Sequence, residues 1–359
     1  MSLFSLKLLP ASDGDCLILS WSDGGPLKHM VVDGGRAGTY PYLKKQFVRM
    51  AENGEELELY VLTHIDADHI SGALSYLKDS RRPIAPKDVW FNGYRQIKGE
   101  GRRSMQQGDA YSAALAKLGW PLNRHFSGGV ASIETAPNPI EVAGLKLSIL
   151  SPDSTRLKAM GERWTRWYRK QDTEGKAATR EGTRASANRN KEPLPNPLVV
   201  EDLVVDTDID SEVPNGTSIA FVAEWQGRRV LFGGDAHPDL LVNSLGPLAD
   251  AEGGRYRVDL LKAPHHGSTK NISRELVERI DCRHIVLSTN GNIHSHPDPQ
   301  AIAKFIHFGS QGRKVLHFNY DTDRTRPWDN ATAKQRYDYE ARYPTGTPGM
   351  IEIDVMACQ

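Results

Sequence analysis

The sequence predicts a layered α/β domain in which helices lie outside packed β-sheets. Short apolar strand patterns occur early and late in the chain, and stretches with the apolar spacing of helices lie between them. Four polar segments rich in histidine, aspartate or glycine each follow such a strand pattern. Their side chains are therefore expected in turns at the ends of strands. A chain of 359 residues is long enough to bury the core that such layers require.

The expected elements follow one another along the chain. In the first half, short apolar runs bounded by turn residues predict strands at 4–9, 16–21, 30–32, 57–62 and 145–150. Helical spacing predicts a helix over 42–52 that ends near Asn53-Gly54. In the second half we expect helices at 273–280 and 299–308. The strands expected there are 218–224, 229–232, 258–263, 285–288, 314–318 and 350–355.

A charged segment interrupts this pattern at about 153–212. Residues 156–191 carry eleven Lys/Arg and four Asp/Glu, whereas residues 192–212 carry seven Asp/Glu and no Lys/Arg. We interpret it as an insertion with a short helix bearing Trp164, Trp167 and Tyr168, then a flexible basic stretch and an acidic arm. It is either a solvated loop whose halves attract one another or a lid, substrate contact or arm for a protein partner.

The composition excludes some classes of partner and location. Lys+Arg and Asp+Glu each number 45, so the net charge is zero and an overall attraction to DNA or anionic lipid is not expected. No apolar run reaches the roughly 18 residues that a membrane span needs, and the first residues are typical of a strand rather than a secretory leader. Three widely spaced cysteines, Cys16, Cys282 and Cys358, form no disulfide framework, which favours a cytoplasmic protein.

The strongest chemical signal is segment 64–69, which reads HIDADH. It contains His64, Asp66, Asp68 and His69 directly after an apolar strand pattern and before a helix start. A sharp turn after a strand can aim all four side chains into one cavity. Carboxylate and imidazole groups together are suited to one or two divalent metal ions.

Three further segments repeat this context. Gly233-Gly234-Asp235 ends one apolar strand pattern, and the adjacent His265 and His266 follow another within the sequence LKAPHHGS. The fourth segment, 288–297, reads STNGNIHSHP and contains His296. The recurrence of one context in four places indicates a common site more strongly than any single segment.

In this order, the motifs HxDxDH, GGD, LKAPHHGS and STNG…HP resemble the metallo-β-lactamase superfamily. More narrowly, they are similar to the soluble hydrolase domain of the competence protein ComEC and its stand-alone relatives. The turn Asp13-Gly14-Asp15 and the segments 32–35 (VDGG) and 215–218 (NGTS) also fit that group. The resemblance runs from about residue 3 to residue 310, without the charged insertion.

The resemblance implies a four-layer αββα sandwich with a metal site along one edge. We therefore expect a hydrolase domain over 1–320 that contains the charged insertion. Residues 321–359 are expected to form a C-terminal extension packed on the same domain.

The resemblance also implies metal ligands, namely His64, Asp66, Asp68, His69, Asp235 and His265. His64 and Asp66 would bind one ion, Asp68 and His69 the other, and Asp235 would bridge them. Either of the neighbours His265 and His266 would complete the second site, and the sequence does not distinguish between them.

Catalytic roles follow from the same resemblance. Asp68 would orient the nucleophile, and His266 or His296 would contact the substrate or donate a proton to the leaving oxygen. Lys262 and Ser268 are either phosphate contacts or structural residues.

Two departures from the superfamily pattern bear on the cofactor. Asp66 stands where a histidine is usual, and a carboxylate shifts metal preference from zinc towards manganese, iron or magnesium, or weakens one site. The third metal histidine expected before Asp235 is missing, and Asn215 is the nearest candidate. We expect one or two divalent ions, zinc or manganese, with iron or magnesium as further options.

The predicted function is that of a metal-dependent hydrolase, most consistent with a phosphodiesterase or nuclease that uses metal-activated hydroxide. Its substrate would be a phosphoester, such as a nucleic acid or nucleotide. One alternative is hydrolysis of carboxylic ester, thioester or lactam bonds. The other is a degenerate metal-binding interaction module without activity.

Overall fold

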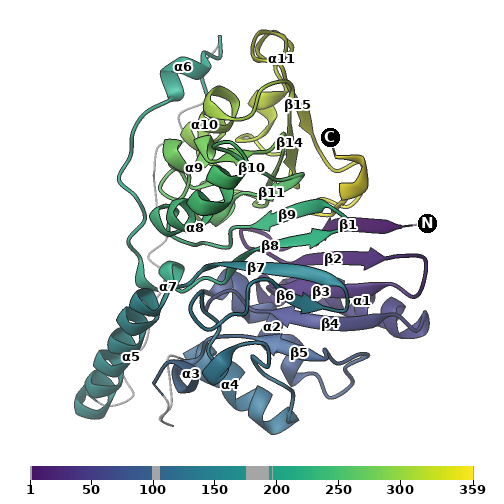
Figure 1. Cartoon of the computed structure of the whole chain (residues 1–359), viewed down its shortest axis with the longest axis vertical. Coiled ribbons are helices and arrows are strands. Elements are labelled where there is room, and N and C mark those ends of the chain that lie inside the picture. Colours follow the sequence, from purple (N-terminus) through teal and green to yellow (C-terminus); the bar gives the residue numbers. More distant parts are fainter. Residues whose placement is uncertain (1, 99–105, 175–193, 196, 359) are drawn as a thin grey trace.

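The computed structural model describes residues 2–98, 106–174, 194–195 and 197–358. Two large β-sheets pack face to face, and helices cover the outer face of each (Figure 1). This is the four-layer αββα arrangement of the predicted fold class. Figure 1 shows α8, α9 and α10 on one side of the sheets and α2, α3 and α4 on the other.

The first sheet has six strands in the order β16-β1-β2-β3-β4-β5. Neighbours are antiparallel from β16 to β3 and parallel from β3 to β5. Its strands are β1 (Leu3–Leu8), β2 (Leu17–Ser22), β3 (Lys28–Val32), β4 (Glu56–Val61), β5 (Asp88–Trp90) and β16 (Ile351–Asp354). The helices of this half are α1 (Tyr40–Glu52), α2 (Ala67–Lys78), α3 (Tyr94–Lys98) and α4 (Gln106–Leu118).

The second sheet has eight strands in the order β15-β14-β13-β11-β9-β8-β7-β6. The block from β15 to β9 is parallel, and the rest is antiparallel. Its strands are β6 (Ile140–Val142), β7 (Leu145–Ser151), β8 (Ala220–Trp225), β9 (Arg228–Phe232), β11 (Leu260–Lys262), β13 (His284–Leu287), β14 (Lys314–Phe318) and β15 (Tyr339–Arg342). A separate pair joins β10 (Tyr256–Arg257) to β12 (Ile280–Asp281).

The helices of this second half are α8 (Pro238–Ala251), α9 (Arg274–Glu278), α10 (Pro299–Phe308) and α11 (Ala331–Tyr337).

Alternate residues of the strands explain the layering. Val230 and Phe232 of β9 point into the core between the sheets, whereas Leu231 packs under the helices on the outer face. β9 is therefore apolar on both faces, as expected for a buried parallel strand.

Two glycines let loops approach α2 more closely than any side chain would allow. A Cβ on Gly14 would lie 1.8 Å from the carbonyl oxygen of Asp68, and a Cβ on Gly34 would lie 2.1 Å from the amide nitrogen of Ala73. The amide of Gly34 also donates to the carbonyl of His69 at 2.8 Å. The loops after β1 and β3 thus press on the start of α2 and hold its first turn in place.

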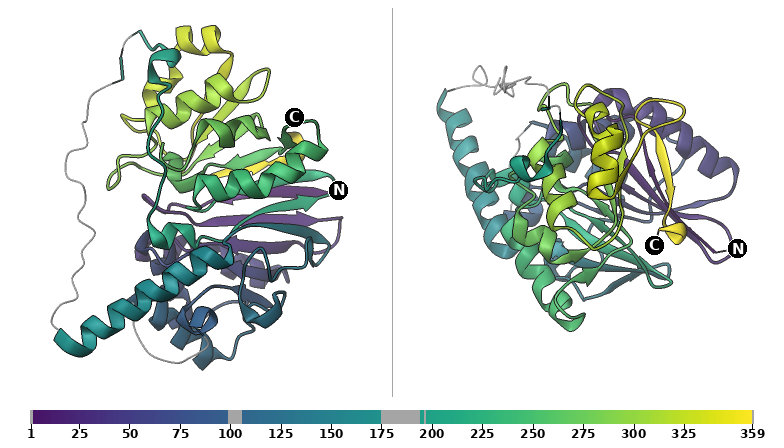
Figure 2. Two further views of the ribbon diagram at one scale, coloured as in Figure 1. Left: turned by 60° about the vertical axis from the view of Figure 1, so that its left-hand side comes forward. Right: turned by 90° about the horizontal axis from the view of Figure 1, so that it is seen from above.

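The charged insertion contains more regular structure than its composition predicts. A helix of 21 residues, α5 (Ser154–Glu174), replaces the short helix that we expected, and it projects along the outside of the molecule (Figure 2). Trp164 on α5 is buried in a cluster with Tyr94 and Ile65. The predicted basic stretch lies largely in residues 175–193, outside the described residues.

The acidic part of the insertion is not simply a solvated arm. It includes the short helices α6 (Val200–Leu203) and α7 (Val213–Gly216), and Asp210 between them is buried. Two amide side chains donate hydrogen bonds to Asp210: Asn215 at 2.7 Å and Asn271 at 2.9 Å. The segment is therefore anchored to the body of the protein next to β11.

The last forty residues contribute to both sheets. β15 pairs in parallel with β14, and β16 pairs antiparallel with β1. Within the described parts of the chain, no helix combines the length and apolar character needed to cross a membrane.

Candidate functional site

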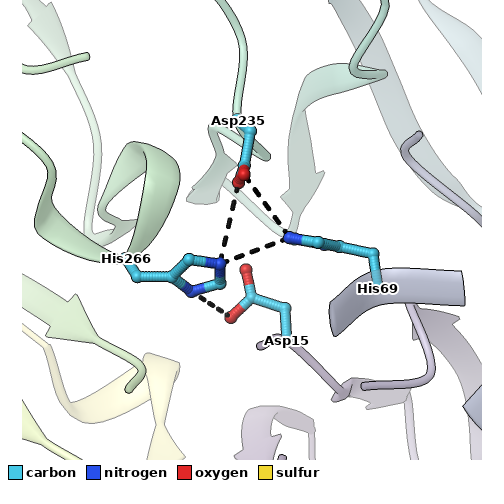
Figure 3. A group of neighbouring side chains, drawn as sticks. All are labelled: Asp15, His69, Asp235 and His266. Carbon is cyan, nitrogen blue, oxygen red and sulfur yellow. Dashed lines mark hydrogen bonds and ion pairs between the residues drawn. The ribbon is translucent and has the colours of Figure 1, made fainter. Parts of the chain in front are cut away.

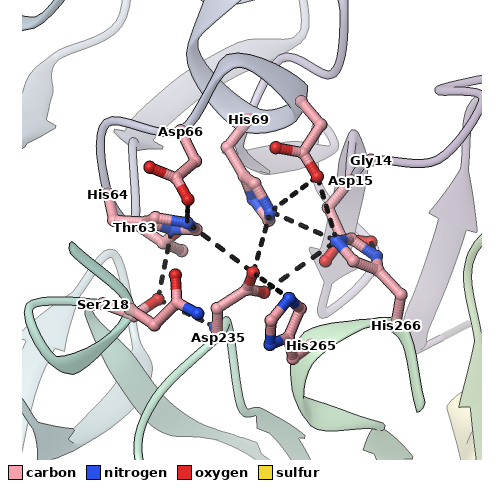
Figure 4. A network of polar contacts seen from close by, with 12 residues as sticks. Gly14, Asp15, Thr63, His64, Asp66, His69, Ser218, Asp235, His265 and His266 are labelled. Carbon is pink, nitrogen blue, oxygen red and sulfur yellow. Dashed lines mark hydrogen bonds and ion pairs between the residues drawn. The ribbon is translucent and has the colours of Figure 1, made fainter. Parts of the chain in front are cut away.

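Several strand ends meet at one edge between the two sheets. Segment 64–69 follows β4, Asp235 follows β9, and the adjacent His265 and His266 follow β11. The turn between β1 and β2 adds Asp15 from the opposite side. Figure 4 shows these side chains converging on one point from separate elements.

The start of α2 divides the HIDADH motif. Asp66 is extended and occupies the N-cap position without a side-chain capping bond, whereas Asp68 and His69 lie in the first turn of the helix. The backbone therefore aims His64 and Asp66 from one side and Asp68 and His69 from another. The positive end of the helix also favours the Asp68 carboxylate.

Asp235 occupies the centre of the arrangement and is buried. Its Oδ2 lies 3.6 Å from Nε2 of His64, 3.5 Å from Nε2 of His69 and 3.6 Å from Nε2 of His265. Its Oδ1 lies 3.9 Å from Nε2 of His266. One carboxylate thus faces four imidazole rings, each through the same ring nitrogen.

The opposite nitrogens of these rings are held by other groups. Nδ1 of His69 bonds Asp33 at 2.8 Å, and Nδ1 of His265 bonds the amide oxygen of Asn271 at 2.8 Å. Nδ1 of His266 bonds a backbone carbonyl at the end of β13 at 2.9 Å. Anchoring Nδ1 in this way fixes the tautomer and leaves Nε2 for a ligand, as is typical of metal-binding histidines.

The remaining carboxylates form two neighbouring sets around Asp235. Oδ2 of Asp66 lies 3.8 Å from Nε2 of His64. Oδ2 of Asp68 lies 3.7 Å from Nε2 of His69 and 3.5 Å from Nε2 of His266. Asp235 borders both sets.

The structure distinguishes the two neighbouring histidines. His266 lies with Asp68 and His69, and the two Nε2 atoms of His69 and His266 are 3.3 Å apart. Nε2 of His265 approaches only Asp235 in this group. Both histidines have left-handed backbone conformations, with φ of 45° and 53°. This conformation strains residues other than glycine, and it lets adjacent side chains reach two places in one site.

Asp15 belongs to the same cluster, although sequence analysis did not select it as a ligand. One ligand atom from each of Asp15, His69, Asp235 and His266 lies within 4.8 Å of the others (Figure 3). Asp15 also forms a buried ion pair with Lys262, with Oδ2 2.8 Å from Nζ. Lys262 is therefore a structural partner of Asp15. The signal available in the sequence was the tight Asp13-Gly14-Asp15 turn.

Two other candidates lie beside the cluster. The ring of His296 lies 5.4 Å from that of His265, and its Nδ1 faces Asp298 at 3.3 Å. Asn215, considered as a replacement for the missing histidine, donates its amide to Asp210. Asp210 in turn lies 3.6 Å from Nδ1 of His265, a supporting position that the sequence pattern did not reveal.

Comparisons with known proteins agree with this architecture. The family model described as "Metallo-beta-lactamase superfamily" matches residues 21–289. This chain belongs to the metallo-beta-lactamase superfamily. The match includes the HIDADH motif, Asp235 and both adjacent histidines, but not Asp15 or His296. Members of the superfamily are metal-dependent hydrolases.

Similar solved structures include the metallo-beta-lactamase fold protein YhfI from Bacillus subtilis, with a TM-score of 0.39, 11% identity, and coverage of 98% of this chain and 100% of that chain. The long form of RNase Z from yeast has a TM-score of 0.39 and 12% identity, covering 99% of this chain and 42% of that chain. MEM-A1, a subclass B3 enzyme from a soil metagenome library, has a TM-score of 0.32 and 10% identity, covering 84% of this chain and 89% of that chain. A search of curated proteins found no match.

At the edge between the two sheets where these side chains meet, some buried polar atoms lack a hydrogen-bond partner among the described residues. They include Nε2 of His64, Oδ1 of Asp235 and Oδ1 of Asp15. Buried polar atoms are rarely left unpaired, because desolvation without compensation is costly. A cation bound among these atoms would satisfy them.

Electrostatics indicate the same requirement. Burial raises the pKa of Asp235, but the surrounding histidines, led by His265, outweigh it and hold the pKa well below its usual range. Burial lowers the pKa of His265, but Asp235 and then Asp210 raise it to about 9. The carboxylates thus stabilise positive charge at this site, and they favour the protonated form of His265 when no metal is bound.

The pKa of His266 shows the same balance. Burial lowers this pKa, but Asp15 and then Asp235 raise it to about 10. Imidazole nitrogens and carboxylate oxygens are ligands that zinc, manganese and iron accept. The residues present therefore fit one or two divalent ions.

Proposed function

We propose that this protein is a metal-dependent phosphodiesterase or nuclease, similar to the soluble hydrolase domain of ComEC. The observation that carries the proposal is the pair of adjacent ligand sets around Asp235. Two ions that share a carboxylate are typical of enzymes that cleave phosphoesters, because both the attacking and the leaving oxygen need stabilisation.

We assign the first ion to His64, Asp66 and His265, and the second to Asp68, His69 and His266. Asp235 would be shared. In this assignment His265 takes the place of the histidine that is missing before β9. The additional carboxylate of Asp66 favours manganese over zinc at the first position, because harder oxygen ligands suit harder ions.

A bound divalent ion supplies Lewis acidity and lowers the pKa of its water from 15.7 to about 7. The chain itself provides orientation. Asp68 can accept a hydrogen bond from the attacking water and hold it in line. Nδ1 of His296 faces Asp298, so its Nε2 remains to hold or pass a proton at a substrate oxygen.

The test combines metal content with a simple diester substrate. We expect about two ions per chain in protein purified without chelator, and hydrolysis of bis-p-nitrophenyl phosphate that manganese stimulates. Asp235→Asn should abolish turnover and lower metal content, because the shared ligand is weakened. Asp23→Asn, in an exposed turn, is the matched control and should change neither.

Other outcomes would favour the alternatives. Bound metal with hydrolysis of p-nitrophenyl esters or thioesters, and none of the diester, would indicate acyl chemistry. Absence of both metal and turnover with any ion would indicate an interaction module, with the charged insertion as the surface to examine for a protein partner.

A further inference from the structure

Three loops form one rim beside the candidate metal centre. They are residues 11–15, residues 289–296 and residues 320–325. The amide of Asn290 donates to the carbonyl of Ser12 at 2.8 Å, and the amide of Ser12 donates to the Tyr320 hydroxyl at 3.1 Å. These bonds hold the rim together as one surface.

Two basic side chains, Arg36 and His294, flank the first of these loops. Arg36 donates two hydrogen bonds of 2.6 Å to the buried carboxylate of Asp13, so these two charges neutralise one another. Nε2 of His294 lies 4.0 Å from the same carboxylate, and the His294 side chain keeps 35% of its exposure. His294 is thus accessible at the rim.

Arg324 is the third basic residue of the rim. Its Cδ lies against Gly291, where a Cβ would approach to 2.9 Å. The side chain is half-buried, and no ion pair or side-chain hydrogen bond to its guanidinium is found in the described part of the chain. The nearby Asp321 and Asp323 pair with Arg326 instead. A half-buried guanidinium of this kind is well suited to a phosphate.

A row of imidazole rings connects the rim to the metal centre. The rings of His265 and His296 are 5.4 Å apart, and those of His296 and His294 are 6.2 Å apart and stacked. A group held at His294 would therefore be a neighbour of one held at the centre. Arg324 adjoins this row, because its Cδ and the carbonyl oxygen of His296 both lie against Gly291. The other side of His265 is bordered by the acidic segment that contains Asp210, which disfavours anions there.

We propose that Arg324 and His294 form an anion subsite that binds a second phosphate group of the substrate. The pair of Arg36 with the buried Asp13 supports the loop on which the subsite rests. The inference rests on the proposed phosphodiesterase function and narrows it. The substrate carries at least one phosphate next to the scissile one, as in an oligonucleotide, and is not an isolated diester.

The test compares a substrate that has one phosphate with one that has several. Bis-p-nitrophenyl phosphate and a short single-stranded oligothymidylate are hydrolysed under the same metal conditions. Arg324→Gln and His294→Gln should each lower kcat/KM for the oligonucleotide about tenfold more than for the small diester. Arg326→Gln, directly after the same loop but paired with two aspartates, is the control and should leave both values unchanged.

Binding provides a second readout that does not depend on turnover. Fluorescence anisotropy of a labelled oligothymidylate is measured at several salt concentrations with wild-type protein and with each variant. Each phosphate contact contributes about −0.7 to the slope of log K against log salt for single strands. Arg324→Gln should therefore flatten the slope by about 0.7.

The outcomes separate the two proposals. If the wild type cleaves neither substrate, the proposed function is wrong, and the binding slope still decides whether the subsite exists. If both substrates are cleaved, and Arg324→Gln lowers kcat/KM equally for both and leaves the salt slope of binding unchanged, the subsite is refuted. The proposed phosphodiesterase function is then retained.

Discussion

Replacing Asp15 with asparagine should destabilise the protein by leaving a buried positive charge. Nζ of Lys262 lies 2.8 Å from Oδ2 of Asp15, and the two side chains are 1% and 2% exposed. The other hydrogen bond of Lys262 goes to the carbonyl of Ala263. Asparagine keeps the size of the side chain but removes the charge that neutralises the ammonium.

The magnitude follows from the burial. Removing one partner of a buried ion pair costs about 3–5 kcal/mol in the free energy of unfolding. The entropy of unfolding of a domain of this length is about 0.7 kcal/mol/K, from about 2 cal/mol/K per residue. We therefore expect the melting temperature to fall by about 4–7 °C.

The assay is thermal unfolding in chelator, so that changes in metal binding at the neighbouring cluster do not contribute to the measured stability. The second variant, Asp15→Asn with Lys262→Met, removes both charges and should recover most of the loss. Glu352→Gln breaks the Lys7 pair, in which Glu352 is 54% exposed, and should change stability by less than about 0.5 kcal/mol. A double variant as unstable as Asp15→Asn alone, or a single variant within a degree of wild type, would refute this reasoning.

Four further predictions follow from the site. Metal binding to chelator-treated protein at pH 7.5 should release at least two protons, because the pKa values of the ligands His265 and His266 are about 9 and 10, and Asp235 outweighs burial to raise the pKa of His69 as well. Calorimetry in two buffers of different ionisation enthalpy measures this, and zero release would contradict it. Because both pKa values are raised above the unfolded value of about 6.5, the stability they contribute is complete below that pH. The melting temperature of the metal-free protein, measured in chelator, should therefore fall as pH rises from about 7 through 10. A melting temperature that does not change with pH would count against these pKa shifts. His265→Ala should lower metal content from about two ions to one by elemental analysis, whereas unchanged content would remove His265 from the ligand set. Gly14→Ala should displace Asp68 and cost about 3 kcal/mol or more in chemical denaturation, whereas Gly246→Ala, whose Cβ would meet nothing within 4 Å, should not destabilise the protein.

Much of the fold could be predicted from local pattern. The strand over 314–318 and the helix over 299–308 coincide with β14 and α10. These elements combine a continuous apolar run or a clear helical stripe with turn residues at both ends, so local preference and burial agree. The short strands β6 and β15 were not predicted, because three or four residues carry too little periodicity to stand out.

The length of α5 shows where composition misled the prediction. Leu157, Met160, Trp164 and Tyr168 form a buried stripe at helical spacing. The many charged residues between them favoured a short helix followed by a solvated loop. Packing of that stripe against Tyr94 and Ile65 extends the helix. Tertiary contact therefore outweighed an unfavourable local composition.

The amino-acid sequence by itself determined the chemistry of the candidate site, because residue types after strand ends define which ligands and charges are available. The convergence of Asp15, Asp235 and segment 64–69 depends on chain segments about 50 to 220 residues apart, and only the packing of the two sheets brings them together. The different positions of the His265 and His266 side chains depend on two consecutive left-handed residues, which no spacing pattern predicts. The sequence pattern indicates which side chains follow each strand. The backbone turns and the close approach of loops decide which of their atoms come into contact.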